Sequence, residues 1–285
     1  MNERRPAVPF DERLEWDRDG QYYHYLTKWM HALNRVSRVT GGSTYNIWAM
    51  ELAKTAHDRF TYASSSGGQK RMYWKMSIDL SYPLVPSMGH HDPLDGLITY
   101  HELQATAAKD PEESTGLNLK AEIADTTEIC KGKIWVTDDP LGIGGLLGDA
   151  FIVAQLIINK YFTQTDLLEI LLDSSLPGLE SYLRKNPLKL PADYRLAFRE
   201  LGLAIGLRAV KKLRALIEKN QDLFNRKLPL HSRIESLTRY TSFSEKIEMF
   251  WLETANQEAD TWTEHRDINM VMLATSLAPD GYLTL

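Results

Sequence analysis

One segment of the chain, residues 75–96, gathers side chains that could do acid–base chemistry. Its acids and histidines are Asp79, His90, His91, Asp92 and Asp95. Prolines and glycines recur between them and restrict or redirect the backbone. Catalytic and binding groups concentrate on loops of this kind, where neighbouring charges shift one another's pKa. The segment therefore predicts a functional site, although it does not specify a reaction.

The three aspartates differ in whether the local sequence predicts a structural role for them. Asp79 follows a predicted strand, so it either acts in the site or fixes a turn through a hydrogen bond. Asp92 precedes a helix predicted to begin at Pro93, and Asp95 lies in its first turn. Free N–H groups and the helix dipole favour carboxylates at both places. For Asp92, capping and catalysis do not exclude each other.

The histidines fit proton transfer better than metal binding. His90 and His91 are adjacent, so their side chains diverge, whereas zinc-binding histidines are usually separated by several residues. One of them beside Asp79 or Asp92 would form a pair that titrates near neutral pH. A histidine bonded to loop carbonyls is the structural alternative. We expect no metal or other cofactor, with a carboxylate-bound calcium as the open alternative.

Aromatic side chains flank this segment and a second acidic stretch. Tyr73 and Trp74 directly precede residues 75–96, and Trp135 precedes a stretch that contains Asp138. Because the C–H faces of sugar rings stack on aromatic rings, these four residues are the predicted substrate-binding set. Packing in a core is the alternative for each ring, and a simple turn is the alternative for Asp138.

Helical periodicity dominates the elements that would position these groups. Residues 19–64 predict two antiparallel helices joined at Gly41, with Trp29 and Val36 on the buried face of the first and Trp48 on that of the second. Further helices are expected near residues 93–108, 117–131, 146–161, 164–185, 193–220, 231–259 and 265–276. A short strand is expected within 70–78, and residues 1–18 are expected to be extended. The predicted class is all-α, built from helical hairpins.

Composition excludes some functions. The net charge of −5 argues against a general nucleic-acid or anionic-membrane binder. The apolar run at 143–158 contains Asp149 and is shorter than the ~20 residues of a membrane span, so it predicts a buried helix. The N-terminus lacks the apolar run of a signal peptide, and Cys130 is the only cysteine. We therefore expect a cytoplasmic protein with no membrane or nucleic-acid partner.

The first hairpin and the start of the apolar helix resemble those of the six-hairpin glycosidases and their epimerase and lyase relatives. The matching residues are Trp29, Ala32-Leu33, Thr40-Gly41, Tyr45, Trp48-Ala49 and Gly144-Gly145-Leu-Leu-Gly148-Asp149. The resemblance implies one α/α toroid domain over residues 19–285. A chain of 285 residues is short for twelve full helices, so either the ring is incomplete or the natural N-terminal part is absent. A tetratricopeptide array is the alternative, but the hairpins do not recur every ~34 residues.

The resemblance implies a carbohydrate-active enzyme, most simply a glycoside hydrolase with paired carboxylates. Asp79 with Asp92 or Asp95 would be acid and base, one of the two histidines would orient them, and Trp74 would stack on the sugar. The expected ligand is a small carbohydrate or an oligosaccharide. A sugar epimerase or lyase on the same fold, or a non-catalytic helical scaffold that binds a protein, are the alternatives.

Overall fold

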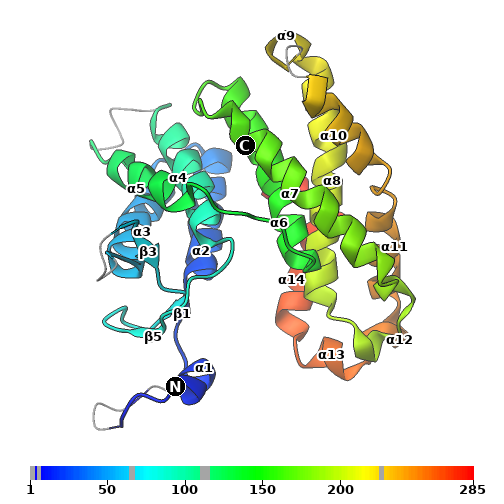
Figure 1. Cartoon of the computed structure of the whole chain (residues 1–285), viewed down its shortest axis with the longest axis horizontal. Coiled ribbons are helices and arrows are strands. Elements are labelled where there is room, and N and C mark those ends of the chain that lie inside the picture. Colours follow the sequence, from blue (N-terminus) through cyan, green and yellow to red (C-terminus); the bar gives the residue numbers. More distant parts are fainter. Residues whose placement is uncertain (1–3, 5–7, 64–67, 110–115, 225–227) are drawn as a thin grey trace. The chain divides into compact units, whose positions relative to one another are not determined.

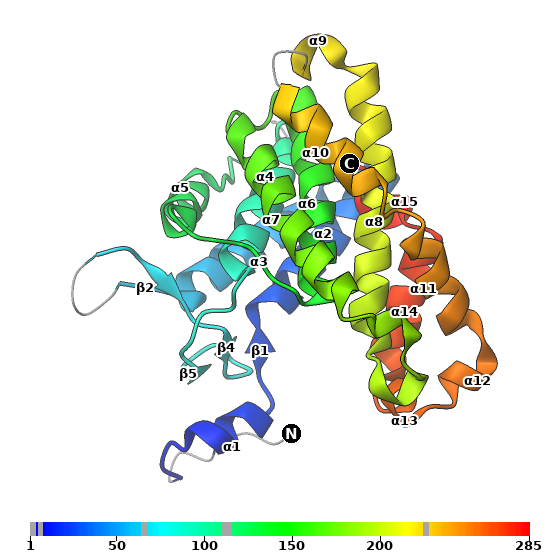
Figure 2. The ribbon, with the colours of Figure 1, turned by 45° about the vertical axis from the view of Figure 1, so that its right-hand side comes forward.

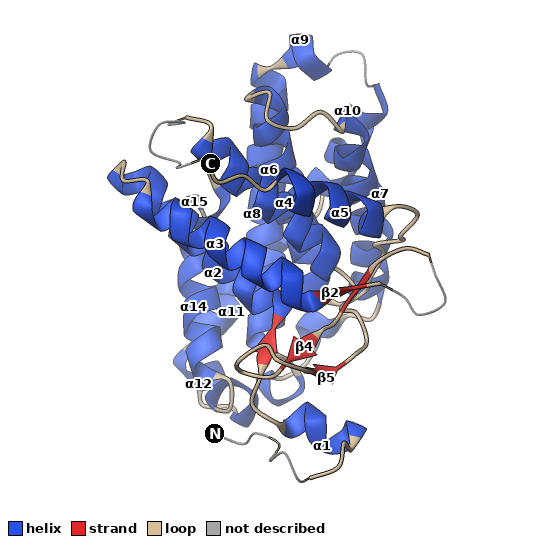
Figure 3. Ribbon diagram, turned by 90° about the vertical axis from the view of Figure 1, so that its left-hand side faces the viewer, coloured by secondary structure: helices blue, strands red, loops and turns tan. Residues whose placement is uncertain are grey.

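The computed structural model describes residues 4, 8–63, 68–109, 116–224 and 228–285. These residues are mostly helical with a few short strands, which confirms the predicted helical class (Figures 1 and 3). The chain divides into two compact units, residues 1–133 and 134–285. Closure of the hairpins into a toroid stays a prediction.

The N-terminal unit is built on the helices α2, α3, α4 and α5. Helix α2 packs on α3 and α4, α3 packs on α4, and α4 packs on α5. The elements of this unit are α1 (Glu12–Asp17), β1 (Gln21–Tyr22), α2 (Tyr23–Thr40), α3 (Thr44–Phe60), β2 (Thr61–Tyr62), β3 (Arg71–Met72), β4 (Lys75–Met76), β5 (Pro83–Val85), α4 (Asp92–Ala107) and α5 (Lys120–Cys130). Helix α1 lies in the segment expected to be extended, and it forms because Asp11 accepts hydrogen bonds from the first N–H groups.

The strand expected within residues 70–78 is two strands that belong to different sheets. Strand β3 pairs with β2, whereas β4 lies between β1 and β5 in a three-stranded antiparallel sheet. Tyr22 of β1 is opposite Lys75 of β4, and α2 begins at the next residue, Tyr23. The sheet therefore ties the start of α2 to the start of the segment predicted to hold the site.

The predicted α2–α3 hairpin is confirmed, but the predicted buried face of α2 is wrong. Gly41 ends α2 with φ 74° and donates its N–H to the Ser37 carbonyl at 2.9 Å. Trp29 and Val36, and Trp48 on α3, are exposed. The buried residues of α2 are Tyr23, Thr27, Met30, His31, Asn34 and Ser37. Several of these residues are polar, and side chains on the neighbouring helices form hydrogen bonds with them. The buried face of α2 is therefore only partly apolar, which is why the sequence pattern did not identify it.

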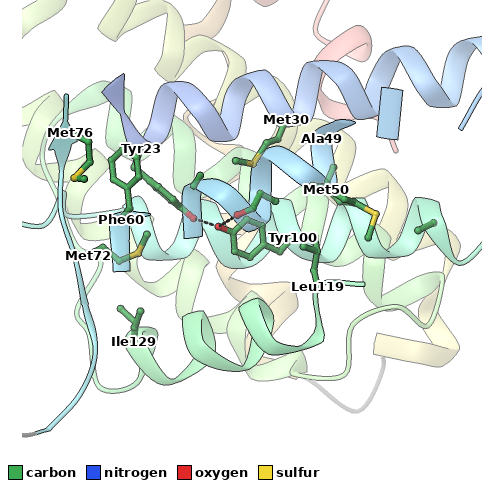
Figure 4. Packing of buried hydrophobic residues seen from close by; sticks show 14 residues of the cluster. Tyr23, Met30, Ala49, Met50, Phe60, Met72, Met76, Tyr100, Leu119 and Ile129 are labelled. Atoms are coloured by element: carbon green, nitrogen blue, oxygen red, sulfur yellow. Dashed lines mark hydrogen bonds between the residues drawn. The ribbon is translucent and has the colours of Figure 1, made fainter. Parts of the chain in front are cut away.

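Two tyrosines join α2 to α4 in the core of the N-terminal unit. The hydroxyls of Tyr23 and Tyr100 are 2.7 Å apart, and both side chains are fully buried (Figure 4). The ring of Tyr23 can approach α4 because Gly96 has no side chain, and a Cβ at Gly96 would collide with the Tyr23 hydroxyl. This contact sets how closely the two helices approach at the N-terminal end of α4.

The C-terminal unit is organised around α8, which packs on α6, α10, α11 and α14; Figure 2 shows α6 and α8 side by side. Its elements are α6 (Pro140–Ile158), α7 (Thr165–Arg184), the 3-10 turns at Pro187–Lys189 and Ala192–Tyr194, α8 (Ala197–Lys219), α9 (Gln221–Phe224), α10 (Leu228–Thr238), α11 (Phe243–Leu252), α12 (Thr254–Gln257), α13 (Asp260–Thr263), α14 (Arg266–Leu277) and α15 (Asp280–Leu283). Helix α6 begins earlier than expected because Asp139 caps it and Pro140 fits its first position.

Helix α6 is apolar except at Asp149 and Gln155, which are both buried. Among the described residues it is the one helix long and apolar enough to cross a membrane, and 78% of its most apolar window is buried. It packs against α7 and α8. This burial is typical of the central helix of a folded core, as the sequence predicted.

A buried ion pair joins the start of α8 to α11. The Arg195 guanidinium donates to the Glu200 carboxylate at 2.6 Å, and the indole N–H of Trp251 donates to the same oxygen at 2.9 Å. Arg195 also lies 3.6 Å from the centroid of the Phe250 ring. Because the Arg195 side chain is hydrogen-bonded to Glu200, and Glu200 also to Trp251, we assign this ion pair a structural role.

Glycines bring the backbones of α6 and α8 into contact. A Cβ at Gly144 would collide with the Gly202 carbonyl, and one at Gly206 would collide with the Gly144 carbonyl. A Cβ at Gly145, in the next position of α6, would meet nothing within 4 Å. The crossing therefore depends on glycine at Gly144 and Gly206 and not at Gly145.

These two environments predict opposite effects of the same substitution. Gly144→Ala should lower the free energy of unfolding by about 1–3 kcal/mol, because the helices must separate. Gly145→Ala should raise it by about 0.5–1 kcal/mol, because alanine is the better helix former. Urea denaturation of both variants and the wild type measures the difference. Equal effects of the two substitutions would contradict the close crossing.

Candidate functional site

The predicted site segment runs from β4 through a turn to β5 and then through a loop into α4. Asp79 lies in the turn and is exposed. Its Oδ1 accepts hydrogen bonds from the Ser77 hydroxyl at 2.7 Å, the Ser81 hydroxyl at 2.7 Å and the Ser81 N–H at 3.1 Å. These bonds, the Ser77 one foremost, lower the pKa of Asp79. The geometry matches the turn-fixing alternative, and a catalytic role of Asp79 stays a prediction.

Asp92 lies in a different environment, at the first residue of α4. Its side chain is buried, with the residue 5% exposed, and among the described residues its Oδ2 has no hydrogen-bond partner. The N-cap is His91, and α4 has no side-chain cap. Asp92 therefore does not cap the helix as the sequence suggested. A buried carboxyl group without a capping role needs another explanation.

The loop before α4 covers this carboxyl group. A Cβ at Gly89 would collide with all three carboxyl atoms of Asp92, so only glycine lets the backbone lie this close. The neighbouring residues Ser87 and His90 are exposed. The backbone of Gly89 thus lies directly against the Asp92 carboxyl group.

Burial raises the pKa of Asp92 to about 8, from the ordinary aspartate value of 3.8. The loss of hydration is the largest cause, and the nearby charge of Asp95 adds to it. Lys28 and the Gly89 backbone act in the opposite direction. Asp92 is therefore protonated at neutral pH, so this carboxyl group can donate a proton.

Asp95 lies three residues further along α4, on the same side of the helix. Its Oδ1 is 3.6 Å from the ammonium group of Lys28, which belongs to α2. The Asp95 carboxyl is 13% exposed, and that of Asp92 is more deeply buried. The two predicted acids therefore lie together but in unlike surroundings, one paired with a cation and the other desolvated.

Helix α2 supplies two site residues that the sequence did not predict. Lys28 pairs with Asp95, and His24 lies one turn earlier on the same helix face. Burial lowers the pKa of His24, Asp95 raises it and Lys28 lowers it, so the three groups lie within electrostatic reach. Their spacing of four residues on α2 was the available signal, but α4 could not be identified as their neighbour from the sequence.

An aromatic cluster adjoins His24. The Trp74 ring centroid lies 5.5 Å from that of Tyr22, and Tyr22 lies 5.5 Å from Tyr25. Tyr25 in turn lies 4.3 Å from the His24 ring. Trp16 of α1 packs edge-on against Trp74 at 4.7 Å. The predicted stacking residue Trp74 is thus connected to His24 through the rings of Tyr22 and Tyr25.

The remaining predicted residues of the N-terminal unit are less directly connected to the acid pair. Tyr73 stacks on Tyr62 of β2 with ring centroids 4.2 Å apart. His90 and His91 contact each other with centroids 4.6 Å apart. Both histidines belong to the loop that covers Asp92, and their role in orienting the acids stays a prediction.

Trp135 and Asp138 belong to the C-terminal unit. Trp135 is buried there, and Asp138 is exposed and forms an ion pair with Lys185. That pairing lowers the pKa of Asp138. The substrate-binding role predicted for these two residues stays a prediction.

The described residues do not form a metal-binding cluster. Over residues 4, 8–63, 68–109, 116–224 and 228–285, no group of three or more His, Cys, Asp and Glu side chains is arranged to hold a metal ion. The side chains at the N-terminal end of α4 instead suit proton transfer: a neutral acid, a carboxylate paired with a lysine, and an imidazole.

Burial of Asp92 predicts a pH-dependent stability. Because its pKa is raised from 3.8 to about 8, the folded protein keeps this proton where the unfolded chain has lost it. The contribution of Asp92 to stability is therefore fully present below about pH 4 and is lost as the pH rises to about 8, by up to about 1.4 kcal/mol for each pH unit. The Asp92→Asn variant lacks this titration.

The measurement is the difference in unfolding free energy between wild type and Asp92→Asn across this pH range, from urea denaturation. We expect the wild type to lose stability relative to the variant as the pH rises. His24 titrates in both proteins, so the subtraction removes its contribution. A difference that does not change with pH would show that Asp92 is ionised throughout.

Comparison with family models, with curated proteins and with solved structures finds no match to this chain. The chemistry of the site therefore rests on its own side chains, and membership of the six-hairpin glycosidases stays a prediction.

Proposed function

We propose that the N-terminal unit catalyses hydrolysis of a glycosidic bond, with Asp92 as the general acid and Asp95 as the carboxylate that activates water or attacks the sugar. One observation carries the proposal: two carboxyl groups one helical turn apart lie in unlike environments, one buried and the other in an ion pair with a lysine. Burial keeps Asp92 neutral at pH 7, whereas Asp95 forms an ion pair with Lys28. A carboxyl group that keeps its proton, beside a second carboxyl group in a different environment, is the arrangement that glycoside hydrolysis requires.

The roles of the two aspartates follow from which group donates a proton and which supplies a negative charge. Cleavage of a glycosidic bond leaves an alkoxide unless an acid protonates the leaving oxygen, and Asp92 has the proton to give. The developing positive charge on the sugar is stabilised by an anion, which Asp95 supplies. Lys28 forms an ion pair with Asp95, and His24 lies within electrostatic reach of both groups.

Substrate must displace the loop before α4 to reach Asp92. A general acid acts only within hydrogen-bond distance of the oxygen that it protonates, and the Gly89 backbone now occupies that space. Ser87 and His90 of this loop are exposed. Movement of this loop would expose the acid to the substrate, and its return would exclude bulk water.

The choice of a sugar substrate is supported by the ring cluster that reaches His24. Tyr22, Tyr25 and Trp74 form a contacting cluster that reaches His24, and Tyr25 is exposed. Flat apolar faces next to carboxyl groups suit a pyranose, whose C–H face is apolar and whose edge carries hydroxyls.

Three matched aspartate variants test the assignment. Asp92→Asn and Asp95→Asn should each lower turnover of a glycan found by screening by about 10²–10⁴-fold. Asp79→Asn should leave the chemical step intact, because Asp79 is exposed and bonded within its own turn. Wild-type turnover should fall as the pH rises through about 8, where Asp92 loses its proton.

A second substrate separates the two roles. An aryl glycoside with an acidic phenol needs little protonation of its leaving group, so it should restore most of the turnover of Asp92→Asn and none of that of Asp95→Asn. Circular dichroism of each variant controls for folding. Full activity of Asp92→Asn on the natural linkage would overturn the proposal, and a product with an unsaturated ring or an inverted carbon would replace hydrolysis by lyase or epimerase chemistry.

A further inference from the structure

We propose that residues 86–91, which connect β5 to α4, form a lid whose position is set by the protonation of Asp92. The lid is closed while the Asp92 carboxyl group carries a proton, and it opens when that group ionises. This deepens the proposed function by naming what controls access to its acid, and it rests on that function only for the consequence for turnover.

Two contacts hold the lid closed. The backbone of Gly89 lies directly against the Asp92 carboxyl group, since a Cβ at Gly89 would collide with both carboxyl oxygens. Met88 is partly buried and packs against the hydrophobic core of the N-terminal unit. Ser87 and His90, on either side of these residues, are exposed. Lifting the lid would therefore break one contact with the carboxyl group and one with the core.

The two ends of the lid are fixed. At one end, Leu84 and Val85 of β5 are buried, and β5 pairs with β4. At the other end, Gly96 of α4 lies against the hydroxyl of Tyr23. A loop between two fixed ends can move without unfolding of the elements that it connects.

Ionisation of Asp92 makes the closed position unfavourable. The residue is 5% exposed, and its Oδ2 has no hydrogen-bond partner among the described residues. A hydrogen bond from the Gly89 backbone favours the charged form but does not offset the loss of hydration, which raises the pKa to about 8. A buried carboxylate without a full set of partners costs far more than the exposure of part of one methionine. Opening the lid, which returns water to the carboxylate, is therefore the less costly outcome.

The charged groups around Asp92 come from both helices and from the lid. Asp95 on α4 raises the pKa of Asp92, and Lys28 on α2 lowers it. The other titratable groups nearby are Tyr23 and His24 of α2 and His90 and His91 of the lid. The pKa of Tyr23 is raised above 10.0 and that of His24 is lowered below 6.5, so neither titrates where Asp92 does. The two lid histidines are retained when Asp92 is replaced, so that variant controls for them.

In the proposed reaction, the lid links substrate entry to movement of one proton. When the lid opens in water, Asp92 releases its proton to the solvent. A sugar that displaces this water restores an apolar cover, so Asp92 takes a proton back from the solvent before it protonates the leaving oxygen.

The experiment is NMR of the full chain with carbon-13-labelled methionine methyl groups, without substrate, from about pH 6 to about pH 9.5, a range that includes the Asp92 pKa of about 8. The Met88 signal is identified by its absence in Met88→Leu. We expect it to move to the position of a solvent-exposed methionine with the same midpoint as Asp92, the ratio of open to closed lid changing about tenfold for each pH unit. In Asp92→Asn the signal should keep its low-pH position throughout.

Two variants should move the midpoint in opposite directions. Lys28→Met should raise it, because Lys28 favours the ionised form of Asp92, and Asp95→Asn should lower it, because Asp95 opposes that form. Asp79→Asn, at an exposed aspartate, should behave like the wild type. Met72 is fully buried in the core of the same unit, so its methyl signal should not move.

Four results would overturn the proposal: a Met88 signal that stays in place, the same movement in Asp92→Asn, a midpoint that ignores Lys28→Met and Asp95→Asn, or a parallel movement of Met72, which would indicate unfolding of the unit. Failure of the proposed function is distinguishable, because no substrate is present. If the Met88 titration is as expected but the wild type turns over no glycoside, the lid stands and the catalytic assignment of Asp92 and Asp95 falls.

Discussion

The approach of Tyr23 to α4 is the contact on which the N-terminal unit depends. Gly96 leaves space for the tyrosine, and the hydroxyl reaches that of Tyr100 at 2.7 Å. The helices are thereby held close enough for other polar pairs to form between them, including His31 with Glu102 at 2.7 Å. Such pairs are stable inside a protein only when their partners are fixed, because an unpaired buried polar group is costly. The same close approach buries the start of α4.

That burial raises the pKa of Asp92. A carboxyl group with the same neighbours in the sequence would be an ordinary helix-terminal acid if it faced water. Covered by Gly89 and placed near Asp95, it holds its proton at neutral pH. The proposed division between an acid and an anion thus follows from packing and not from residue type, and it explains why Asp79, which is exposed, does not share it.

The sequence predicted local features well and long-range ones poorly. The α2–α3 hairpin, its end at Gly41 and the start of α4 beside Pro93 follow from rules that act over a few residues. The buried face of α2 was wrong because Trp29 looks like core, whereas the true face is held by partners on α4. The sequence did not predict a role for Lys28 because its partner, Asp95, is distant in the chain. The burial of Asp92 could not be predicted either, because it depends on how α2 and α4 pack.

The most direct test of this account is a carbon-13 NMR titration of the aspartate carboxyl carbons, with the Asp92 signal identified by its absence in Asp92→Asn. The account predicts that this carbon titrates with a pKa of about 8, and that displacement of the loop by Gly89→Ala moves the pKa downward. A pKa for Asp92 near the ordinary aspartate value of 3.8 would contradict this assignment, because Asp92 would then be ionised at neutral pH and unable to act as the acid.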